Sequence, residues 1–259
     1  MKSRLLLKST IALAISTSAS ITTAQDKVVV VPMLDTKTVY TGLGTTGNTM
    51  CSSFVGGSVG HWVETPCEDL VPSLKGQDAE IQTGVDSVPR YTDNGDGTVT
   101  DNTTQLIWLK NAYCAAEVLG DNWSDALGLV VELNTSGTMN GNDCGDTSDN
   151  GSFQFDWRLP NVKELQTIVY YGPASGPFVS NSNGDGQYSD GNPFLGLRTN
   201  EAYWSSTSYG FEFDPDILLN GLNGTNLLDD ALRVNFSDGV TDGTSKEGLQ
   251  HVWAVRGGT

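Results

Sequence analysis

The sequence predicts an α+β fold with two helices, short antiparallel strands and long loops. Three observations predict it. Two segments repeat apolar residues at helical spacing behind a capping asparagine, several short segments carry β-branched and aromatic residues, and the connections are rich in Gly, Asn and Asp. We expect a main domain over residues 89–259, with an extension over residues 25–88 packed on it.

Residues 1–24 predict a signal peptide. Lys2, Arg4 and Lys8 form a basic start, residues 10–21 are apolar or small, and Ala24 is the small residue that a signal peptidase accepts. A membrane anchor is the alternative, but this apolar run is short for about 30 Å of hydrocarbon. We therefore expect cleavage after Ala24, no transmembrane segment afterwards, and a secreted, periplasmic or cell-surface location.

The chain is strongly acidic. It has 31 Asp and Glu against 14 Lys and Arg, a formal net charge of −17. Such a field repels phosphate backbones and sulfated polysaccharides, so we expect no nucleic acid partner. We interpret the charge as favouring solubility outside the cell; the alternative is that some carboxylates collect divalent cations.

Four cysteines in an exported chain predict two disulfides. Of the three pairings, we predict Cys51 with Cys67 and Cys114 with Cys144, because each closes a local, turn-rich loop. A zinc site is the alternative. It is disfavoured because no C-x-x-C occurs and the two histidines stand at no paired spacing.

The extension contains few regular elements. A valine run at residues 28–31 ends at Pro32 and is either an edge strand or a tether. Residues 38–67 predict short strands closed by the first disulfide, and residues 71–88 are polar and irregular.

The main domain begins with a predicted β-hairpin. Two glycines and two Asx residues at 94–97 favour a tight turn between the strand-forming residues 90–92 and 98–100. The short apolar run at residues 106–109 then predicts a buried strand.

Each predicted helix begins at an asparagine. Asn122 caps the first, with Asp125 at the third position. Asn161 caps the second, and Glu164 follows three residues later. The predicted buried faces are Trp123, Ala126, Leu127, Val130 and Leu133 in the first helix and Val162, Leu165, Ile168 and Val169 in the second. Arg158 can pair with Glu164 or Asp156.

Two loops and three strands complete the predicted domain. Residues 134–152, pinned by Cys144, are too rich in Gly, Asn and Asp to bury a core, and residues 171–202 show no periodicity. A loop as long as the second is either functional or disordered. We predict strands at residues 203–207, 232–236 and 251–256, the last two with alternating burial.

The hairpin and four later segments resemble the bacterial family typified by the C-terminal domain of the Legionella collagen-like adhesin. The four segments are Asp156–Gln166, Tyr203–Thr207, Leu232–Phe236 with Asp238-Gly239, and Val252–Gly258. The resemblance implies a secreted, Lcl C-terminal-like domain with a C-type-lectin-like architecture. Its best-known member binds sulfated glycosaminoglycans, and the net charge argues against that ligand here.

No catalytic residue is assigned. A hydrolase triad needs a serine beside a histidine, and neither His61 nor His251 accompanies a G-x-S-x-G motif. Lectin-like enzymes that generate formylglycine depend on active-site cysteines, which this chain is expected to use in disulfides. We therefore predict that the protein is not an enzyme.

One loop has the alternating oxygen side chains that open a calcium-binding loop. The candidate ligands are Asn181, Asn183, Asp185 and Asp190. The twelfth position is Asn192 rather than a glutamate, and a flexible loop has the same composition. Calcium is therefore a candidate, and no cofactor is required.

Aromatic residues in the loops are candidates for stacking on sugars, with Asn and Asp accepting hydroxyl groups. They are Tyr188, Phe194, Tyr209 and Phe211, whereas Trp108, Trp157, Trp204 and Trp253 are assigned to the core. We predict a secreted or surface-exposed, non-catalytic binding or adhesion module that recognises a glycan or protein through its loops, as a monomer or a homo-oligomer. The alternatives are a cation-dependent enzyme acting on an extracellular polymer and a structural envelope protein.

Overall fold

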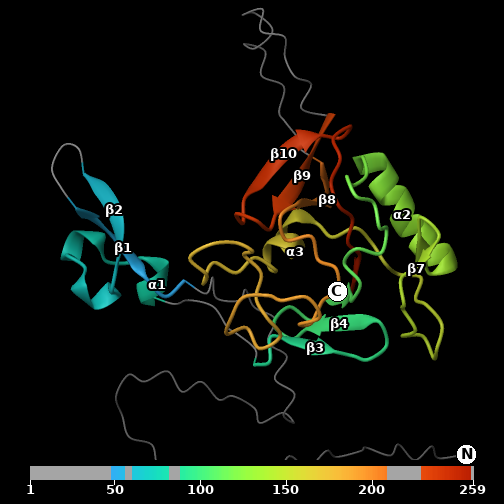
Figure 1. Cartoon of the computed structure of the whole chain (residues 1–259), viewed down its shortest axis with the longest axis horizontal. Coiled ribbons are helices and arrows are strands. Elements are labelled where there is room, and N and C mark those ends of the chain that lie inside the picture. Colours follow the sequence, from blue (N-terminus) through green and yellow to red (C-terminus); the bar gives the residue numbers. More distant parts are fainter. Residues whose placement is uncertain (1–47, 56–59, 82–87, 209–228, 258–259) are drawn as a thin grey trace, which may run out of the picture. The chain divides into compact units, whose positions relative to one another are not determined.

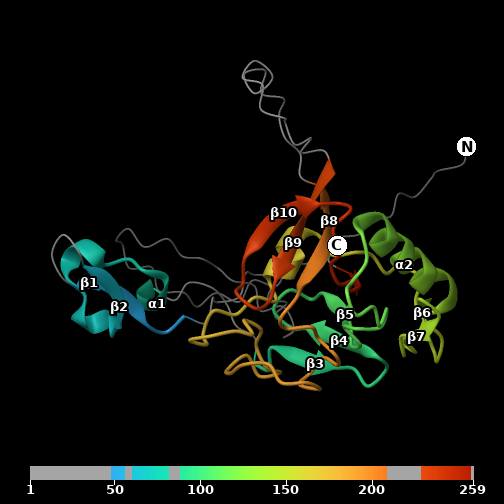
Figure 2. The ribbon, with the colours of Figure 1, turned by 45° about the horizontal axis from the view of Figure 1, so that its top comes forward.

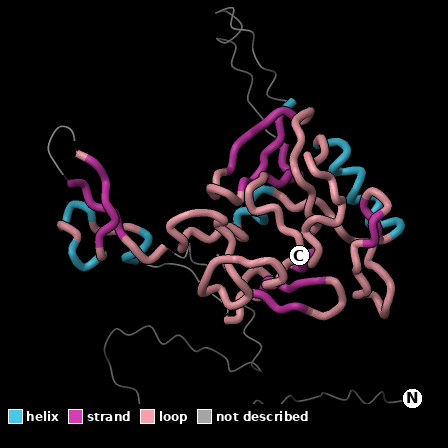
Figure 3. The backbone as a smooth tube through the Cα atoms, in the orientation of Figure 1, coloured by secondary structure: helices cyan, strands magenta, loops and turns pink. Residues whose placement is uncertain are grey.

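The computed structural model describes residues 48–55, 60–81, 88–208 and 229–257. Within these residues the fold is α+β, as the sequence predicts. Short antiparallel strands and helices are joined by loops that make up much of the backbone (Figure 1, Figure 3).

Two antiparallel sheets organise the main domain. The first, in the order β11-β5-β4-β3, consists of β3 (Tyr91–Asp93), β4 (Thr98–Asp101), β5 (Ile107–Leu109) and β11 (Val255–Arg256). The second, in the order β10-β9-β8, consists of β8 (Ala202–Ser208), β9 (Asp230–Asn235) and β10 (Thr241–Ser245). Strands β3, β4 and β5 of the first sheet and β8, β9 and β10 of the second are labelled in Figure 2.

The first sheet opens with the predicted hairpin. Its turn is closed by the Asp96 carboxylate, which accepts the backbone N–H of Thr98 at 3.0 Å. Gly97 has φ +85°, and a Cβ there would collide with the carbonyl oxygen of Gly145. Glycine is therefore required both by the backbone conformation and by the close approach of the loop that contains Gly145.

Helix α2 (Trp123–Ser136) begins and ends where capping chemistry predicts. The Asn122 side chain accepts the N–H of Asp125 at 2.9 Å, and Gly137 ends the helix with φ +74°. The helix buries one face, formed by Ala126, Leu129, Val130 and Leu133. Trp123 and Leu127, also predicted for this face, pack against the core while partly exposed.

Helix α3 (Val162–Gln166) is short but has the full capping box between Asn161 and Glu164. Arg158 donates to both oxygens of Glu164 at 2.7 Å, so Glu164 is its partner rather than Asp156. The predicted apolar stripe is buried at Leu165, Ile168 and Val169 and partly buried at Val162.

The tryptophans assigned to the core are buried. Trp108 and Trp253 pack with ring centroids 4.7 Å apart, and the Trp253 indole donates to the carbonyl of Leu109 at 2.7 Å. The Trp204 indole donates to the carbonyl of Asp121 at 2.8 Å. These two buried indoles therefore find backbone acceptors, and the Trp157 indole donates to the Asp146 carboxylate at 2.8 Å. The Trp108 indole N–H is buried without a hydrogen-bond partner among the described residues.

The predicted alternation in the last strand is wrong. Residues 251–255 are buried without interruption, and only β11 is a regular strand. His251 bridges to Tyr203 in the second sheet, whereas Val255 pairs with Trp108 in the first and with Arg158. The segment joins the two sheets and is covered on both sides, so neither face is left polar.

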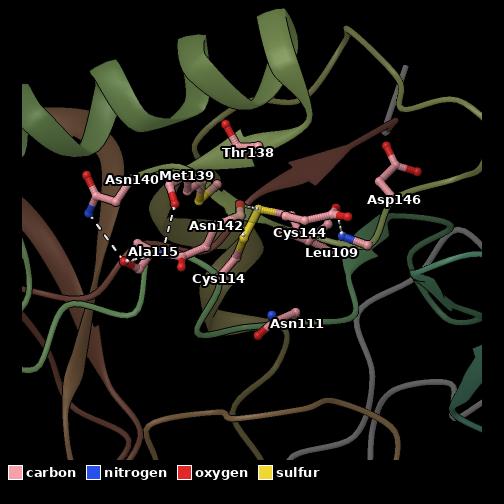
Figure 4. Close-up of a disulfide and its surroundings, with 12 residues drawn as sticks. Leu109, Asn111, Cys114, Ala115, Thr138, Met139, Asn140, Asn142, Cys144 and Asp146 are labelled. Carbon is pink, nitrogen blue, oxygen red and sulfur yellow. Dashed lines mark hydrogen bonds between the residues drawn. A yellow bond between two sulfur atoms is a disulfide. The ribbon is translucent and has the colours of Figure 1, made fainter.

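The loop predicted at residues 134–152 contributes to the core, contrary to expectation. Strands β6 (Thr138–Met139) and β7 (Asn142–Asp143) form a small hairpin, and Met139 is fully buried. The predicted disulfide between Cys114 and Cys144 fixes this hairpin to the segment that follows β5 (Figure 4).

Residues 48–81 form a smaller unit around the predicted disulfide between Cys51 and Cys67. Their elements are β1 (Cys51–Val55), β2 (His61–Thr65), 3-10 turns at Cys67–Asp69 and Pro72–Leu74, and α1 (Asp78–Ile81). Cys51, Leu70 and Ala79 form their buried centre. Among all described residues, no helix has the length and apolar character needed to cross a membrane. The valine run at 28–31 lies outside the described residues.

Candidate functional site

The segment between α3 and β8 forms a shallow pocket of about 380 Å³. The backbone of this segment is drawn in yellow and orange in Figure 1. The lining residues are Pro177, Tyr188, Ser189, Asp190, Gly196, Leu197, Arg198 and Thr199. Two of them, Tyr188 and Asp190, are candidates from the sequence.

The backbone next to the pocket is fixed by hydrogen bonds and by packing against the core. Leu195 exchanges backbone hydrogen bonds with the chain after β5, donating to Lys110 at 2.8 Å and accepting from Ala112 at 2.9 Å. Phe194 beside it is fully buried and packs edge-on against Trp253 at 4.7 Å. The long loop is therefore ordered and partly buried, so the disordered alternative for residues 171–202 is not supported.

Tyr188 and Asp190 meet at the pocket. The Tyr188 hydroxyl lies 3.1 Å from the Asp190 carboxylate and 3.1 Å from the carbonyl of Phe194, and it donates to one of them at a time. Asp190 also accepts the N–H of Gly196 at 2.7 Å. Burial, and then Asp190, raise the pKa of Tyr188, so its hydroxyl stays protonated and can bind polar groups.

Arg198 supplies the positive charge of the pocket. Its backbone N–H donates to the buried Tyr203 hydroxyl at 2.8 Å, and its guanidinium lies 5.2 Å from the centre of the Tyr113 ring. Its Nε is buried and has no hydrogen-bond partner in the described part of the chain. A buried donor without a partner is a cost in the folded protein.

The other arginines that the structure describes are all paired with carboxylates. The pairs are Arg90 with Asp101, Arg158 with Glu164, Arg233 with Asp242 and Arg256 with Asp156. Arg198 forms no such pair with a described residue, although acids outnumber bases by 31 to 14 in the sequence. We did not predict Arg198 from sequence, because nothing in its local pattern distinguishes it from a paired arginine.

The four candidate calcium ligands form hydrogen bonds within the long loop. Asn181 accepts the N–H of Asn183 at 3.1 Å and donates to Asp185 at 2.9 Å, whereas Asp190 bonds within the pocket. Among the described residues, no group of three or more His, Cys, Asp or Glu side chains has a metal-binding arrangement. Calcium binding stays a prediction, which a calcium titration of thermal stability tests.

The four aromatic residues predicted to stack on sugars differ in where they lie. Tyr188 lines the pocket. Phe194 is 0% exposed, so its assignment as a sugar-stacking ring is wrong, because its ring fills the core against Trp253. Tyr209 and Phe211 lie outside the described residues.

His251, one of two histidines considered as a catalytic base, is buried between aromatic rings. It is 5% exposed, with Tyr113 and Tyr203 rings 5.8 and 5.7 Å away. Burial lowers the pKa of its imidazole, which therefore stays neutral near pH 7. His251 therefore lies where a packing residue would.

Asp121, which precedes α2, is the acidic group with the clearest change in pKa. Burial first, and then the negative charges of Glu117 and Asp125, raise the pKa of its carboxyl to about 6. Its Oδ2 is buried without a hydrogen-bond partner among the described residues. The ionised form is therefore disfavoured in the folded protein.

We expect Asp121→Asn to stabilise the protein at pH 7 by on the order of 1 kcal/mol, since partial exposure screens the penalty. Because the folded pKa exceeds the unfolded value, the wild type should gain stability as the pH falls through about 6 towards 4. Urea unfolding at pH 7 and pH 5 measures both effects. If the free energy of unfolding changed equally between pH 7 and pH 5 in the wild type and in Asp121→Asn, a raised pKa of Asp121 would be contradicted.

Comparison with known proteins assigns the chain to a family. A family model described as the Lcl C-terminal domain matches residues 97–256, which is more than half of the chain and includes the pocket, the second sheet and all of the first sheet except β3. No curated protein and no solved structure matches the chain. The chain belongs to the Lcl C-terminal domain family.

Proposed function

We propose that this protein is a secreted or surface-exposed, non-catalytic binding module whose Arg198 pocket receives an acidic group of an extracellular glycan or protein. The observation that carries the proposal is a pocket-lining arginine without a carboxylate partner among the described residues. Two disulfides support an oxidising compartment. The C-type-lectin-like architecture stays part of this proposal.

The chemistry of the pocket suits one acidic group among hydroxyls. A guanidinium binds a carboxylate through paired, charge-assisted hydrogen bonds. Beside it, Asp190 and the Tyr188 hydroxyl offer partners for uncharged hydroxyl groups. Such a mixture of one cation, one carboxylate and neutral polar groups is typical of specific recognition rather than of general attraction to anions.

The net charge of −17 limits the kind of acidic ligand. At physiological ionic strength the field of distant carboxylates is screened beyond about 8 Å, so a single acid close to Arg198 is attracted. A densely sulfated chain would extend past this range and meet the acidic surface. We therefore favour a ligand with isolated carboxylates over sulfated polysaccharides.

The pocket is also organised before a ligand binds. The backbone of Arg198 is tied to Tyr203, which is fully buried, and its side chain lies over Tyr113. Ordering fewer side chains on binding leaves more of the contact energy as affinity. This arrangement supports binding without turnover, as the sequence predicts.

A glycan and matrix-protein array tests the proposal. We expect saturable binding of the wild type to carboxylate-bearing ligands, and a loss of about ten- to a hundredfold in affinity for Arg198→Ala, the size of a charged hydrogen bond. Lys163→Ala, which removes an exposed cation on α3, is the matched control and should bind like the wild type. Absence of any saturable ligand, or equal binding by Arg198→Ala, would rule the pocket out.

A further inference from the structure

Two aromatic rings are exposed on the hairpin formed by β1 and β2. Phe54 and Trp62 are directly opposed, with ring centroids 5.5 Å apart, and are 47% and 60% exposed. Side chains alternate between the faces of a strand, so Ser52 and Glu64 lie on the same outer face as these rings. The opposite face carries Cys51, which belongs to the small buried centre.

The residues around Phe54 and Trp62 fix the positions of the two rings. The disulfide of Cys51 with Cys67 closes the hairpin base, and the Gln77 side chain bonds both the N–H and the C=O of Ser52, at 2.7 and 2.8 Å. The Phe54 ring lies across Gly60, where a Cβ would come within 2.5 Å of it. A ligand therefore meets rings whose positions are already fixed.

The area of this outer face of the hairpin indicates which class of ligand can bind to it. Two strands of five residues span about 17 Å by 10 Å, so the face offers less than roughly 200 Å². A stable protein partner buries about 800 Å² on each side, several times more. One or two sugar rings fit this area, whereas a second copy of the chain does not.

The charge of the face selects the class of sugar. Its polar side chains are Ser52 and Glu64, and neither strand contains a lysine or an arginine. An anionic sugar would meet a carboxylate without a compensating cation. A neutral sugar can place its C–H face on an indole and donate its hydroxyls to Glu64.

We propose that Phe54 and Trp62 form an aromatic platform that binds a neutral polysaccharide. Trp62, the more exposed ring, stacks on a sugar, and Phe54 supports it edge-on. The platform lies outside residues 97–256 matched by the family model and shares no residue with the Arg198 pocket. It therefore adds a second ligand site to the proposed function.

The test is retention of the full mature chain on cellulose, chitin and mannan, with heparin-agarose as the anionic comparison. We expect wild-type retention on at least one neutral polysaccharide and an affinity at least about tenfold lower for Trp62→Ala, as for other tryptophan anchors. Phe155→Ala removes another exposed aromatic ring, 73% exposed, and should leave binding unchanged. Equal thermal stability of the two variants excludes misfolding as the cause.

The proposal is overturned if no neutral polysaccharide retains the wild type, if heparin-agarose retains it through Trp62, or if Trp62→Ala binds normally. A concentration-dependent dimer that Trp62→Ala abolishes would equally overturn it in favour of a second copy. Failure here is separable from failure of the Arg198 pocket, because Arg198→Ala should keep polysaccharide retention and Trp62→Ala should keep the array ligands.

Discussion

Asp101→Asn is expected to lower the free energy of unfolding by about 3–5 kcal/mol, the cost of leaving one charge of a buried pair without its partner. Asp101 is fully buried, and both its oxygens accept from the Arg90 guanidinium at 3.0 Å. One oxygen also accepts the N–H of Thr103 at 2.9 Å. The neutral amide removes the charge while nearly preserving the shape, so the loss reports electrostatics rather than a cavity.

Urea unfolding followed by tryptophan fluorescence measures this loss as a lower midpoint with an unchanged slope. Lys110→Met is the control, because it breaks an exposed pair with Asp93 and should cost less than about 1 kcal/mol. Similar costs for the two variants would show that the pair between Arg90 and Asp101 is not buried as described.

The second large effect concerns the disulfide between Cys114 and Cys144. Replacing both cysteines with serine should cost about 3–4 kcal/mol, because the lost link closes a loop with a sequence separation of 30 residues. The link fixes the hairpin of β6 and β7, including the fully buried Met139 (Figure 4). Without it, the unfolded chain gains freedom and the hairpin loses its anchor.

Thermal unfolding of the single and double variants separates the link from its side chains. Cys144→Ser alone should cost nearly as much as the double variant, since either removes the covalent bond. A single variant that keeps wild-type stability would mean that the bond contributes nothing. The lost stability would then have to come from packing of the second cysteine.

Features that depend on neighbouring residues were predictable from the sequence. Asn122 and Asn161 cap helices because each stands directly before an apolar helical pattern, with an acid at the third position. The hairpin at residues 94–97 follows from turn chemistry alone, and the two disulfides from loop closure. In each case the deciding contact lies within a few residues or within one short loop.

Features that depend on distant segments were not predictable. The sequence around Phe194 predicts an aromatic residue in a loop. In the structure its neighbour Leu195 forms backbone hydrogen bonds with the chain after β5, more than eighty residues earlier, and Phe194 is buried. Residues 251–255 alternate in sequence, yet both sides are covered because the segment joins two sheets. Arg198 became a site candidate only when the structure showed which arginines have partners.

The most direct test of the pocket is an NMR titration of the Arg198 Nε–H resonance with sodium glucuronate and, in parallel, with glucose. These probes differ by one carboxylate on the same ring. We expect a saturable shift of this resonance with glucuronate and none with glucose. No shift with glucuronate, or the same shift with both sugars, would contradict recognition of an acidic group at Arg198.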